Sequence, residues 1–252
     1  MTDADMDPRL RGKTYVVGVG VQKAGTTWLH DYLAGQPDIY MSERKEMHYF
    51  DARFGAKANK IGPMMIRQLK RHLEQIDDRG PIRYPDKLTE LLDMVRMQYD
   101  EQGYPGYFAR RVGGQKLFGE ITPAYALIGE EGFSCMKRFF PRVKVIYLMR
   151  DPVERHHSMM RMAEDDRNEP GFATRSFLET LDRPFGRNMA DYPAHIESLR
   201  KVFVPGEMFF GFYETLFTEQ EIGRLCAFLE IPFAPAAYGT RLNTSSAKSS
   251  LD

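Results

Sequence analysis

The stretch from Thr14 to Leu33 constrains the fold of this chain more than any other. An apolar, β-branched run ends in glycine, a short polar turn follows, and apolar residues then recur at helical spacing from Trp28. This pattern predicts a strand, a loop and a helix in direct succession. Such a loop aims backbone N–H groups and the positive end of the helix dipole at one point. We therefore expect an anion site whose ligand is a phosphate group.

The loop has the glycine spacing of a P-loop, but its cation has moved. Four residues separate Gly20 from Gly25, whereas Thr26 stands where the version for nucleoside triphosphates has lysine. The lysine occurs three residues earlier, as Lys23. In a triphosphate P-loop the lysine bridges the outer phosphates, and a neighbouring Ser or Thr holds magnesium. Moving the lysine changes which oxygen it neutralises.

The string from Gln22 to Trp28 resembles the 5′-phosphosulfate loop, usually written PKSGTTW, of sulfotransferases that use 3′-phosphoadenosine 5′-phosphosulfate (PAPS). Gln22 replaces the proline and Ala24 the serine. The resemblance implies that Lys23 and the backbone N–H groups of the loop bind the phosphosulfate. The cofactor-binding residues implied here are Lys23, Ala24, Gly25, Thr26, Thr27 and Trp28. An ordinary turn between strand and helix is the alternative.

Composition favours one domain over residues 1–252, without a general attraction to polyanions. The 35 basic and 35 acidic residues cancel, so neither nucleic acid nor an anionic membrane is an expected partner. No run of 18 apolar residues and no secretory signal occurs, which indicates a cytoplasmic protein without a membrane span. Cys135 and Cys226 belong to no metal-binding motif, and no metal is expected. The oligomeric state is left open.

Residues 42–51 hold the densest set of ionisable groups near aromatic residues. At strand spacing, Glu46, His48 and Phe50 fall on one face, so a carboxylate and an imidazole can share a pocket. Sulfuryl transfer to a hydroxyl needs a base for its proton and cations for the leaving phosphate. The segment resembles the KExHFF stretch of carbohydrate sulfotransferases, especially the heparan sulfate enzymes. This implies Glu46 as base, with His48 and Asp51 in support; a charged loop covering the core is the alternative.

Residues 52–113 are expected to form a helical insertion over the mouth of the sheet, where it selects the acceptor. Helical spacing predicts a helix from Asp86 to Asp100 and a loop from Gly103 to Gly114. The predicted apolar face of the helix consists of Leu88, Leu91, Leu92, Val95 and Tyr99. Between residues 52 and 73 all charges are basic, which suits either a solvated helix face or a wall for an acidic acceptor. These basic residues are Arg53, Lys57, Lys60, Arg67, Lys70 and Arg71.

Residues 116–125 read as a short strand and a turn, and they resemble the GEKTPxY stretch of the same family. Ile121 replaces the lysine, which in heparan-type enzymes faces the acceptor. This departure argues against a heparan-like substrate. Glu120 is either a structural carboxylate or a second acidic group in the site.

A second strand signal runs from Val143 to Met149. Asp151 as N-cap, Pro152 at the first helical position and Glu154 as capping-box partner predict a helix start. Arg150 is thus fixed at the carboxyl end of a strand, where ligands bind in open α/β sheets. Ser158 lies two turns into the helix on the same face as the cap, so it can share one anion with Arg150.

Arg150 and Ser158 match the 3′-phosphate motif of sulfotransferases, RDPxxRxxS, in type and spacing. Residues 213–216 resemble the family's YEDL turn, which implies that Tyr213 approaches the adenine; a core aromatic is the alternative. In the family a loop near the C-terminus closes over the 3′-phosphate, a role open to Arg241 or Lys248, although a disordered tail is the stronger expectation.

Together these features predict an α/β fold of the three-layer P-loop type, with a central parallel sheet of about five strands flanked by helices. The predicted activity moves a sulfuryl group in line from PAPS to a hydroxyl or amine of an acceptor, a carbohydrate being one candidate, and leaves adenosine 3′,5′-bisphosphate. Glu46 is the base, and His48 orients or replaces it. The alternatives are a P-loop nucleotide or small-molecule kinase, disfavoured by Thr26, and a nucleotide-binding regulatory module without catalysis.

Overall fold

A single parallel sheet organises the computed structural model, which describes residues 6–55, 60–74, 85–181 and 183–235. Across the sheet the strands stand in the order β2-β3-β1-β4-β5, and each neighbouring pair runs parallel. This confirms the predicted fold class. The strands are β1 (Thr14–Gly20), β2 (Ile39–Met41), β3 (Leu117–Ile121), β4 (Val143–Met149) and β5 (Met208–Phe212).

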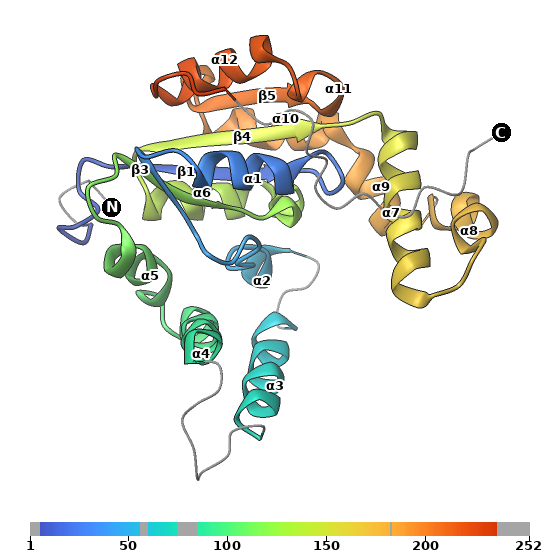
Figure 1. Cartoon of the computed structure of the whole chain (residues 1–252), viewed down its shortest axis with the longest axis horizontal. Coiled ribbons are helices and arrows are strands. Elements are labelled where there is room, and N and C mark those ends of the chain that lie inside the picture. The colour runs from blue at the N-terminus through green and yellow to red at the C-terminus, as the bar shows by residue number, and fades with distance from the viewer. Residues whose placement is uncertain (1–5, 56–59, 75–84, 182, 236–252) are drawn as a thin grey trace.

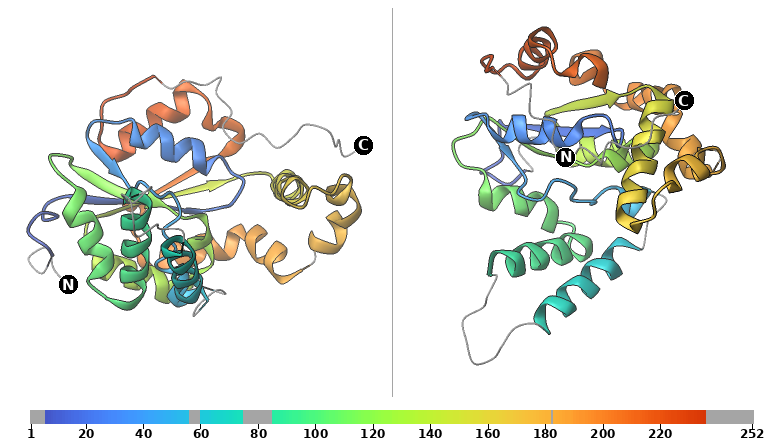
Figure 2. Two further views of the ribbon diagram at one scale, coloured as in Figure 1. Left: turned by 60° about the horizontal axis from the view of Figure 1, so that its bottom comes forward. Right: turned by 45° about the vertical axis from the view of Figure 1, so that its right-hand side comes forward.

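Helices cover both faces of the sheet, as a buried parallel sheet requires. Helices α1 (Thr26–Ala34) and α12 (Glu219–Leu229) lie on one face, and α6 (Gly129–Phe139) and α10 (Tyr192–Val202) on the other (Figures 1 and 2). Among the described residues, no helix is both long and apolar enough to cross a bilayer. The remaining elements of this part of the chain are α7 (Pro152–Arg167), α8 (Phe172–Leu181), α9 (Pro184–Ala190), α11 (Tyr213–Leu216), and the 3₁₀ turns η2 (Pro123–Leu127) and η3 (Pro205–Glu207).

The described part of the chain between β2 and β3 forms four helices, which lie on the α6 side of the sheet (Figure 1). They are α2 (Asp51–Phe54), α3 (Ile61–Leu73), α4 (Pro85–Tyr99) and α5 (Gly103–Arg111). On α4, Leu91 of the predicted apolar face is buried, but Leu92 and Tyr99 are 50% and 64% exposed, so that face is wrong in part. Met94 and Met97 are buried with Leu91.

The loop predicted from Gly103 to Gly114 is wrong, because residues 103–111 form α5. Tyr104 and Phe108 are fully buried and supply the helical face that drives it. Pro105 sits in the first turn, where its missing N–H leaves no hydrogen bond unmade. The glycines and the proline of this stretch are therefore compatible with a helix, although they favour the prediction of a loop.

The two ends of the sheet differ in character. At the amino end, Tyr15 stacks on Phe140 with ring centroids 4.2 Å apart and meets Tyr104 edge to face at 6.5 Å. This aromatic cluster closes the core. At the carboxyl end, the loops that follow β1, β3 and β4 carry the predicted polar motifs, and parallel pairing brings them to one edge.

Candidate active site

The P-loop, residues 20–25, joins the carboxyl end of β1 to α1. Its last residue, Gly25, has a φ of 83°, and a Cβ there would lie 2.8 Å from Cδ2 of Leu216. Only glycine meets both conditions without strain. No described side chain caps the first turn of α1, which leaves its backbone N–H groups available. The loop can therefore bind an anion through backbone donors and the helix dipole.

Lys23 adds a half-buried ammonium group to this loop. Its φ is 68°, and its Nζ lies 3.6 Å from Sδ of Met162 on α7. Burial lowers the pKa of Lys23, and the charges of Arg150, Arg161 and Lys45 lower that pKa further. Cations that repel one another beside a helix start favour a multiply charged anion.

Arg150 joins the second predicted anion site to the first. Its Nη1 donates to the carbonyl oxygen of Lys23 at 3.2 Å, and its guanidinium lies 4.3 Å from the ring centroid of Tyr213. The Tyr192 hydroxyl donates to the carbonyl oxygen of Arg150 at 2.7 Å. The ends of the neighbouring strands β1 and β4 are thus in direct contact through a cation.

The start of α7 differs from its prediction in one respect. Asp151 caps the helix, because its Oδ1 accepts from two first-turn N–H groups at 3.0 and 2.9 Å, and Pro152 follows it. The capping box is wrong: the Glu154 carboxylate lies 3.4 Å from Nη2 of Arg150. The backbone N–H of Asp151 instead donates to Glu214 at 3.0 Å, a partner distant in sequence.

Ser158 lies two turns into α7 and is 8% exposed. Helical spacing places Ser158, Arg161 and Met162 on one side of α7, and Met162 contacts Lys23. This side of the helix therefore faces the P-loop. Sequence reasoning missed Arg161, although its spacing of three residues from Ser158 on a helix could have indicated it.

The other residues of the predicted phosphosulfate loop offer mainly backbone groups. Ala24 is fully buried and Thr26 is 5% exposed, while Thr27 is half-buried. The Trp28 ring stacks on Tyr32 with centroids 5.5 Å apart, so the indole belongs to the core. The N–H groups of these residues are what the loop presents to an anion.

The 44–51 segment follows the edge strand β2 and brings together the predicted acidic and imidazole groups. His48 lies between two carboxylates: its Nδ1 is 2.9 Å from Oδ2 of Asp51, and its Nε2 is 3.5 Å from Oε2 of Glu46. Lys45 Nζ contacts the other oxygen of Glu46 at 2.9 Å. Glu46, His48 and Asp51 therefore form one continuous polar row.

This row determines the charge of its members. Burial disfavours the imidazolium, but the contacts with Asp51 and Glu46 outweigh it and raise the pKa of His48 to about 9. Burial likewise opposes ionisation of Glu46, but His48 and Lys45 lower the pKa of Glu46 to about 2. Near neutral pH the imidazole is cationic and Glu46 is ionised. Glu46 can accept a proton, and His48 can orient it.

The predicted strand spacing in the 44–51 segment is wrong. Residues 42–50 contain no strand, and His48 has a φ of 56°, in the left-handed region. Phe50, predicted to share a face with Glu46, is fully buried and meets Tyr104 edge to face at 5.3 Å. Glu46 and His48 meet because the loop is folded back, not because the chain is extended.

Glu120 and Ile121, the two positions of the 116–125 stretch that the sequence leaves in question, both lie in the core. Glu120 is fully buried, and the hydroxyls of Tyr104 and Tyr125 donate to it. Of the two alternatives for Glu120, a structural carboxylate and a second acidic group in the site, the structure agrees with the first. Ile121 is also fully buried, and a Cβ on Gly18 would lie 2.8 Å from its Cγ2. The side chain at this position packs against β1.

Tyr213 is half-buried between Arg150 and the P-loop, where a Cβ on Gly25 would lie 3.3 Å from its ring. It meets Phe217 edge to face at 5.2 Å. Tyr213 thus lies at the border between the candidate site and the core, so its position is compatible with both alternatives, a residue near the adenine and a core aromatic. Arg241 and Lys248 lie outside the described residues.

The basic run of residues 52–73 does not converge on the site. Lys60, Arg67, Lys70 and Arg71 are exposed, as on a solvated helix face, and Lys57 lies outside the described residues. Arg53 stacks 3.7 Å over the ring of Tyr49 and donates to the Met97 carbonyl at 2.9 Å. Arg44 pairs with Glu90 at 2.8 Å. These contacts tie α4 to the 44–51 segment.

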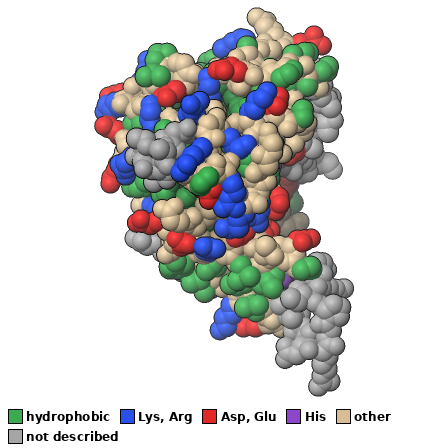
Figure 3. Space-filling model, turned by 90° about the vertical axis from the view of Figure 1, so that its left-hand side faces the viewer, with side chains coloured by type: hydrophobic (Ala, Val, Ile, Leu, Met, Phe, Trp, Pro, Cys, Tyr) green, Lys and Arg blue, Asp and Glu red, His purple; other side chains and the backbone are tan. Residues whose placement is uncertain are grey.

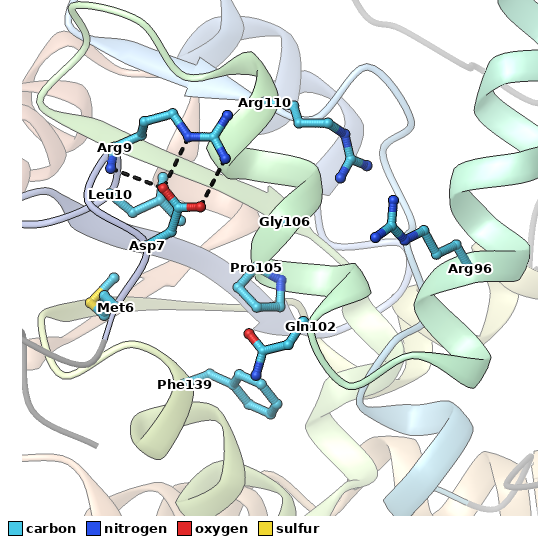
Figure 4. Close-up of a pocket in the computed structure, with 10 residues that line it drawn as sticks. All are labelled: Met6, Asp7, Arg9, Leu10, Arg96, Gln102, Pro105, Gly106, Arg110 and Phe139. Carbon is cyan, nitrogen blue, oxygen red and sulfur yellow. Dashed lines mark hydrogen bonds and ion pairs between the residues drawn. The ribbon is translucent and has the colours of Figure 1, made fainter.

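A cavity of about 390 Å³ opens at the opposite, amino edge of the sheet (Figure 4). Three arginines line it, and each is paired with an aspartate: Arg9 with Asp7, Arg96 with Asp100, and Arg110 with Asp93. Figure 3 shows the face on this side of the molecule, where basic and acidic side chains are interspersed. This cavity lacks the unbalanced positive charge of the P-loop.

A protein-family model described as the sulfotransferase family matches residues 16–235. The chain belongs to the sulfotransferase family. The match confirms the predicted family and enzyme class, supports PAPS as the cofactor, and contradicts the kinase alternative. A comparison with curated protein sequences gave no match.

Solved structures show the same fold in other sulfotransferases. A sulfotransferase from Alicyclobacillus acidocaldarius is 21% identical, with a TM-score of 0.60 over 92% of this chain and 86% of that chain. The sulfotransferase domain of the curacin biosynthetic pathway is 17% identical, with a TM-score of 0.54 over 88% and 76%. The sulfotransferase domain of the Synechococcus PCC 7002 olefin synthase is 17% identical, with a TM-score of 0.52 over 88% and 75%.

Proposed function

We propose that this sulfotransferase moves a sulfuryl group from PAPS to a hydroxyl or amine of an acceptor. The observation that carries the proposal is the hydrogen bond from Arg150 to the Lys23 carbonyl, at 3.2 Å. It joins two cationic sites at neighbouring strand ends, and a nucleotide phosphorylated at both its 5′ and 3′ positions has two anionic groups to match them. PAPS would supply the sulfuryl group.

The nucleotide side of the site consists of the P-loop with α1, and Arg150 with α7. Lys23 and the N–H groups of residues 24–28 would hold the phosphosulfate, while Arg150 and Ser158 would hold the 3′-phosphate. Tyr213, stacked under Arg150, would border the adenine, and Lys248 would add a cation from the tail. The lysine and the backbone donors neutralise charge without a metal ion.

Glu46 is proposed as the base for an in-line transfer. The Glu46 carboxylate is ionised near neutral pH. His48, which lies between Glu46 and Asp51, orients this carboxylate. His48 and Lys45 are the cations that lower the pKa of Glu46. Lys45 lies close enough to Lys23 for the two charges to repel each other. An anion bound beside these two lysines would therefore partly compensate the positive charge that acts on Glu46. The proton affinity of Glu46 would then rise when the nucleotide is present.

The acceptor is proposed to lie beside the 44–51 segment and α4, so that the insertion at residues 52–113 selects it within a single domain, 1–252. The support is the contact of α4 with the segment, through Arg44 and Glu90 at 2.8 Å. The resemblance of residues 45–51 favours a carbohydrate acceptor, whereas the buried Ile121 argues against a heparan-like one.

Calorimetric titration with adenosine 3′,5′-bisphosphate, and in parallel with ATP and magnesium, tests the proposal. We expect tight binding of the bisphosphate without metal, and loss of that binding in Lys23→Ala. Binding of ATP with magnesium, and not of the bisphosphate, would overturn it.

A further inference from the structure

Residues at the end of β3 and in the turn that follows it form a buried polar network that the proposed chemistry does not use. Glu120, Thr122 and Tyr125 are each completely buried at its centre. Tyr104 of α5 and Tyr125 both donate to Oε1 of Glu120, the latter at 2.8 Å. The Thr122 hydroxyl donates to Oε2, and Tyr15 reaches the network through a 2.5 Å contact with the Tyr104 hydroxyl.

The direction of each hydrogen bond follows from groups that can only donate. The N–H groups of Tyr49 and Phe50 lie 3.0 and 3.4 Å from the Tyr125 hydroxyl oxygen, so the hydroxyl proton must go to Glu120. The N–H of Met47 reaches the Thr122 hydroxyl at 3.0 Å and Oε2 of Glu120 at 3.1 Å. Glu120 thus receives only donors in the described structure.

A carboxyl group surrounded in this way has no acceptor for a proton of its own, so the arrangement fits an ionised carboxylate. Burial raises the pKa of Glu120, and the hydrogen bonds of Thr122, Tyr104 and Tyr125 oppose this effect. Such a group is costly to bury unless its donors are all in place. The network therefore fixes the positions of those donors. The Met47 N–H is one of them, and the Tyr125 hydroxyl, another, itself accepts from the N–H groups of Tyr49 and Phe50.

Those three N–H groups flank the polar row. Met47 lies between Glu46 and His48 in the chain, and Tyr49 and Phe50 follow directly. His48 holds a left-handed backbone conformation, with a φ of 56°, which costs free energy unless neighbouring contacts impose it. The hydrogen bonds on either side of His48 supply such contacts.

We propose that Glu120, Thr122 and Tyr125 are positioning residues, which set the Glu46–His48–Asp51 row through the backbone N–H groups of residues 47, 49 and 50. The part of this inference that concerns catalysis rests on the proposed function. The geometrical part does not, because the row and its pKa values belong to the protein without ligands.

The test compares Tyr125→Phe with Tyr15→Phe in the full-length chain. Each variant removes one buried hydroxyl from the same network, but only Tyr125 contacts the 44–51 segment. The readout is the pH titration of the His48 imidazole by NMR with ¹⁵N-labelled histidine, assigned through His48→Asn. Binding of adenosine 3′,5′-bisphosphate is measured by calorimetry on the same samples, and thermal unfolding shows whether each variant is folded.

In Tyr125→Phe we expect the His48 pKa to fall from about 9 by roughly one unit or more, because its carboxylate partners move away. Tyr15→Phe should leave it unchanged, and both variants should bind the bisphosphate as the wild type does. An unchanged His48 titration in Tyr125→Phe, or an equal shift in both variants, would overturn the proposal. If Tyr125→Phe does not fold, Thr122→Val takes its place with the same criteria.

Failure of the proposed function gives a different result. In that case the wild type would not bind the bisphosphate, while the His48 titration would still separate Tyr125→Phe from Tyr15→Phe. Conversely, normal bisphosphate binding with no effect on His48 would overturn the positioning role alone.

Discussion

The two sides of the site are built from different material. On the side proposed to bind the nucleotide, the P-loop and Arg150 sit directly at the ends of the central strands β1 and β4. The first turn of α1, which no described side chain caps, offers backbone N–H groups there. The 44–51 segment follows an edge strand, and side chains from distant parts of the chain hold it in shape. The geometry of the first side is set by the strands and helices themselves, whereas the geometry of the second depends on hydrogen bonds between distant segments. Each can therefore be damaged without the other.

The largest effect is expected for Glu46→Gln. Without a carboxylate to accept the acceptor proton, kcat should fall by about 10²- to 10⁴-fold, measured with any acceptor that the wild type sulfates. Affinity for adenosine 3′,5′-bisphosphate should stay the same. Glu43→Gln is the matched control, since the Glu43 side chain is 69% exposed in the same part of the chain. Equal kcat values in the two variants would contradict a base role for Glu46.

Arg150→Ala should give the reverse pattern, with its main effect on binding. Losing charge-assisted hydrogen bonds to a phosphate should weaken bisphosphate binding by about 10- to 100-fold in calorimetry. Arg110→Ala removes the same charge at the amino edge, where Arg110 pairs with Asp93, and should bind normally. Equal weakening in both variants would mean that overall charge, and not this site, drives binding.

The polar row predicts a pH dependence of stability. Because the folded-state pKa of His48 is raised to about 9, its contribution is complete below about pH 6.5 and is lost as pH rises through 9. Between these limits, urea denaturation should show the wild type losing on the order of 1–3 kcal/mol relative to His48→Asn. Asparagine is chosen because it tolerates a positive φ.

His157→Asn provides the comparison of opposite sign. Burial lowers the pKa of His157, so its contribution to stability is lost as pH falls, not as it rises. Parallel pH profiles for the two variants would contradict the ion pairs assigned to His48.

The smallest effect is expected for Asp151→Ala. Loss of this N-cap should lower the free energy of unfolding by about 0.5–2 kcal/mol, measured with urea. Asp191→Ala removes a similar cap from α10, where Asp191 accepts from the Ala194 N–H at 3.2 Å, and should cost about as much. Only Asp151→Ala should also weaken bisphosphate binding, because it loosens the turn that carries Arg150. If both variants bound the bisphosphate with the same affinity, the Asp151 cap would not contribute to the binding site.

Local sequence patterns predicted the secondary structure around the P-loop and Arg150 well, and that of the 44–51 segment poorly. Strand β4 has the predicted bounds, because a continuous apolar run is a signal within one stretch of chain. The N-cap of α7 is equally local. Its predicted box failed because Glu214, more than sixty residues away, takes the Asp151 N–H.

The remaining differences have the same origin. The backbone of residues 47–50 is held by hydroxyls of Thr122 and Tyr125, which no periodicity in that segment can indicate. The environment of Glu120 depends on Tyr104. Tyr104 belongs to α5, where the glycine and proline of the sequence favour the prediction of a loop. The spacing of Arg161 from Ser158 could have indicated it, but only the fold shows that this side of α7 faces Lys23. Contacts between distant segments are the part that pattern reasoning could not supply.

The strand order has an evolutionary consequence. Because β2 is an edge strand with one neighbour, the chain that follows it can lengthen, shorten or be exchanged without altering the pairing of β1 with β4. Descendants of a common ancestor could thus diversify the helices between β2 and β3 while inheriting the central strands intact. A chimaera that replaces α3 and α4 but retains the 44–51 segment would be the laboratory counterpart of that history.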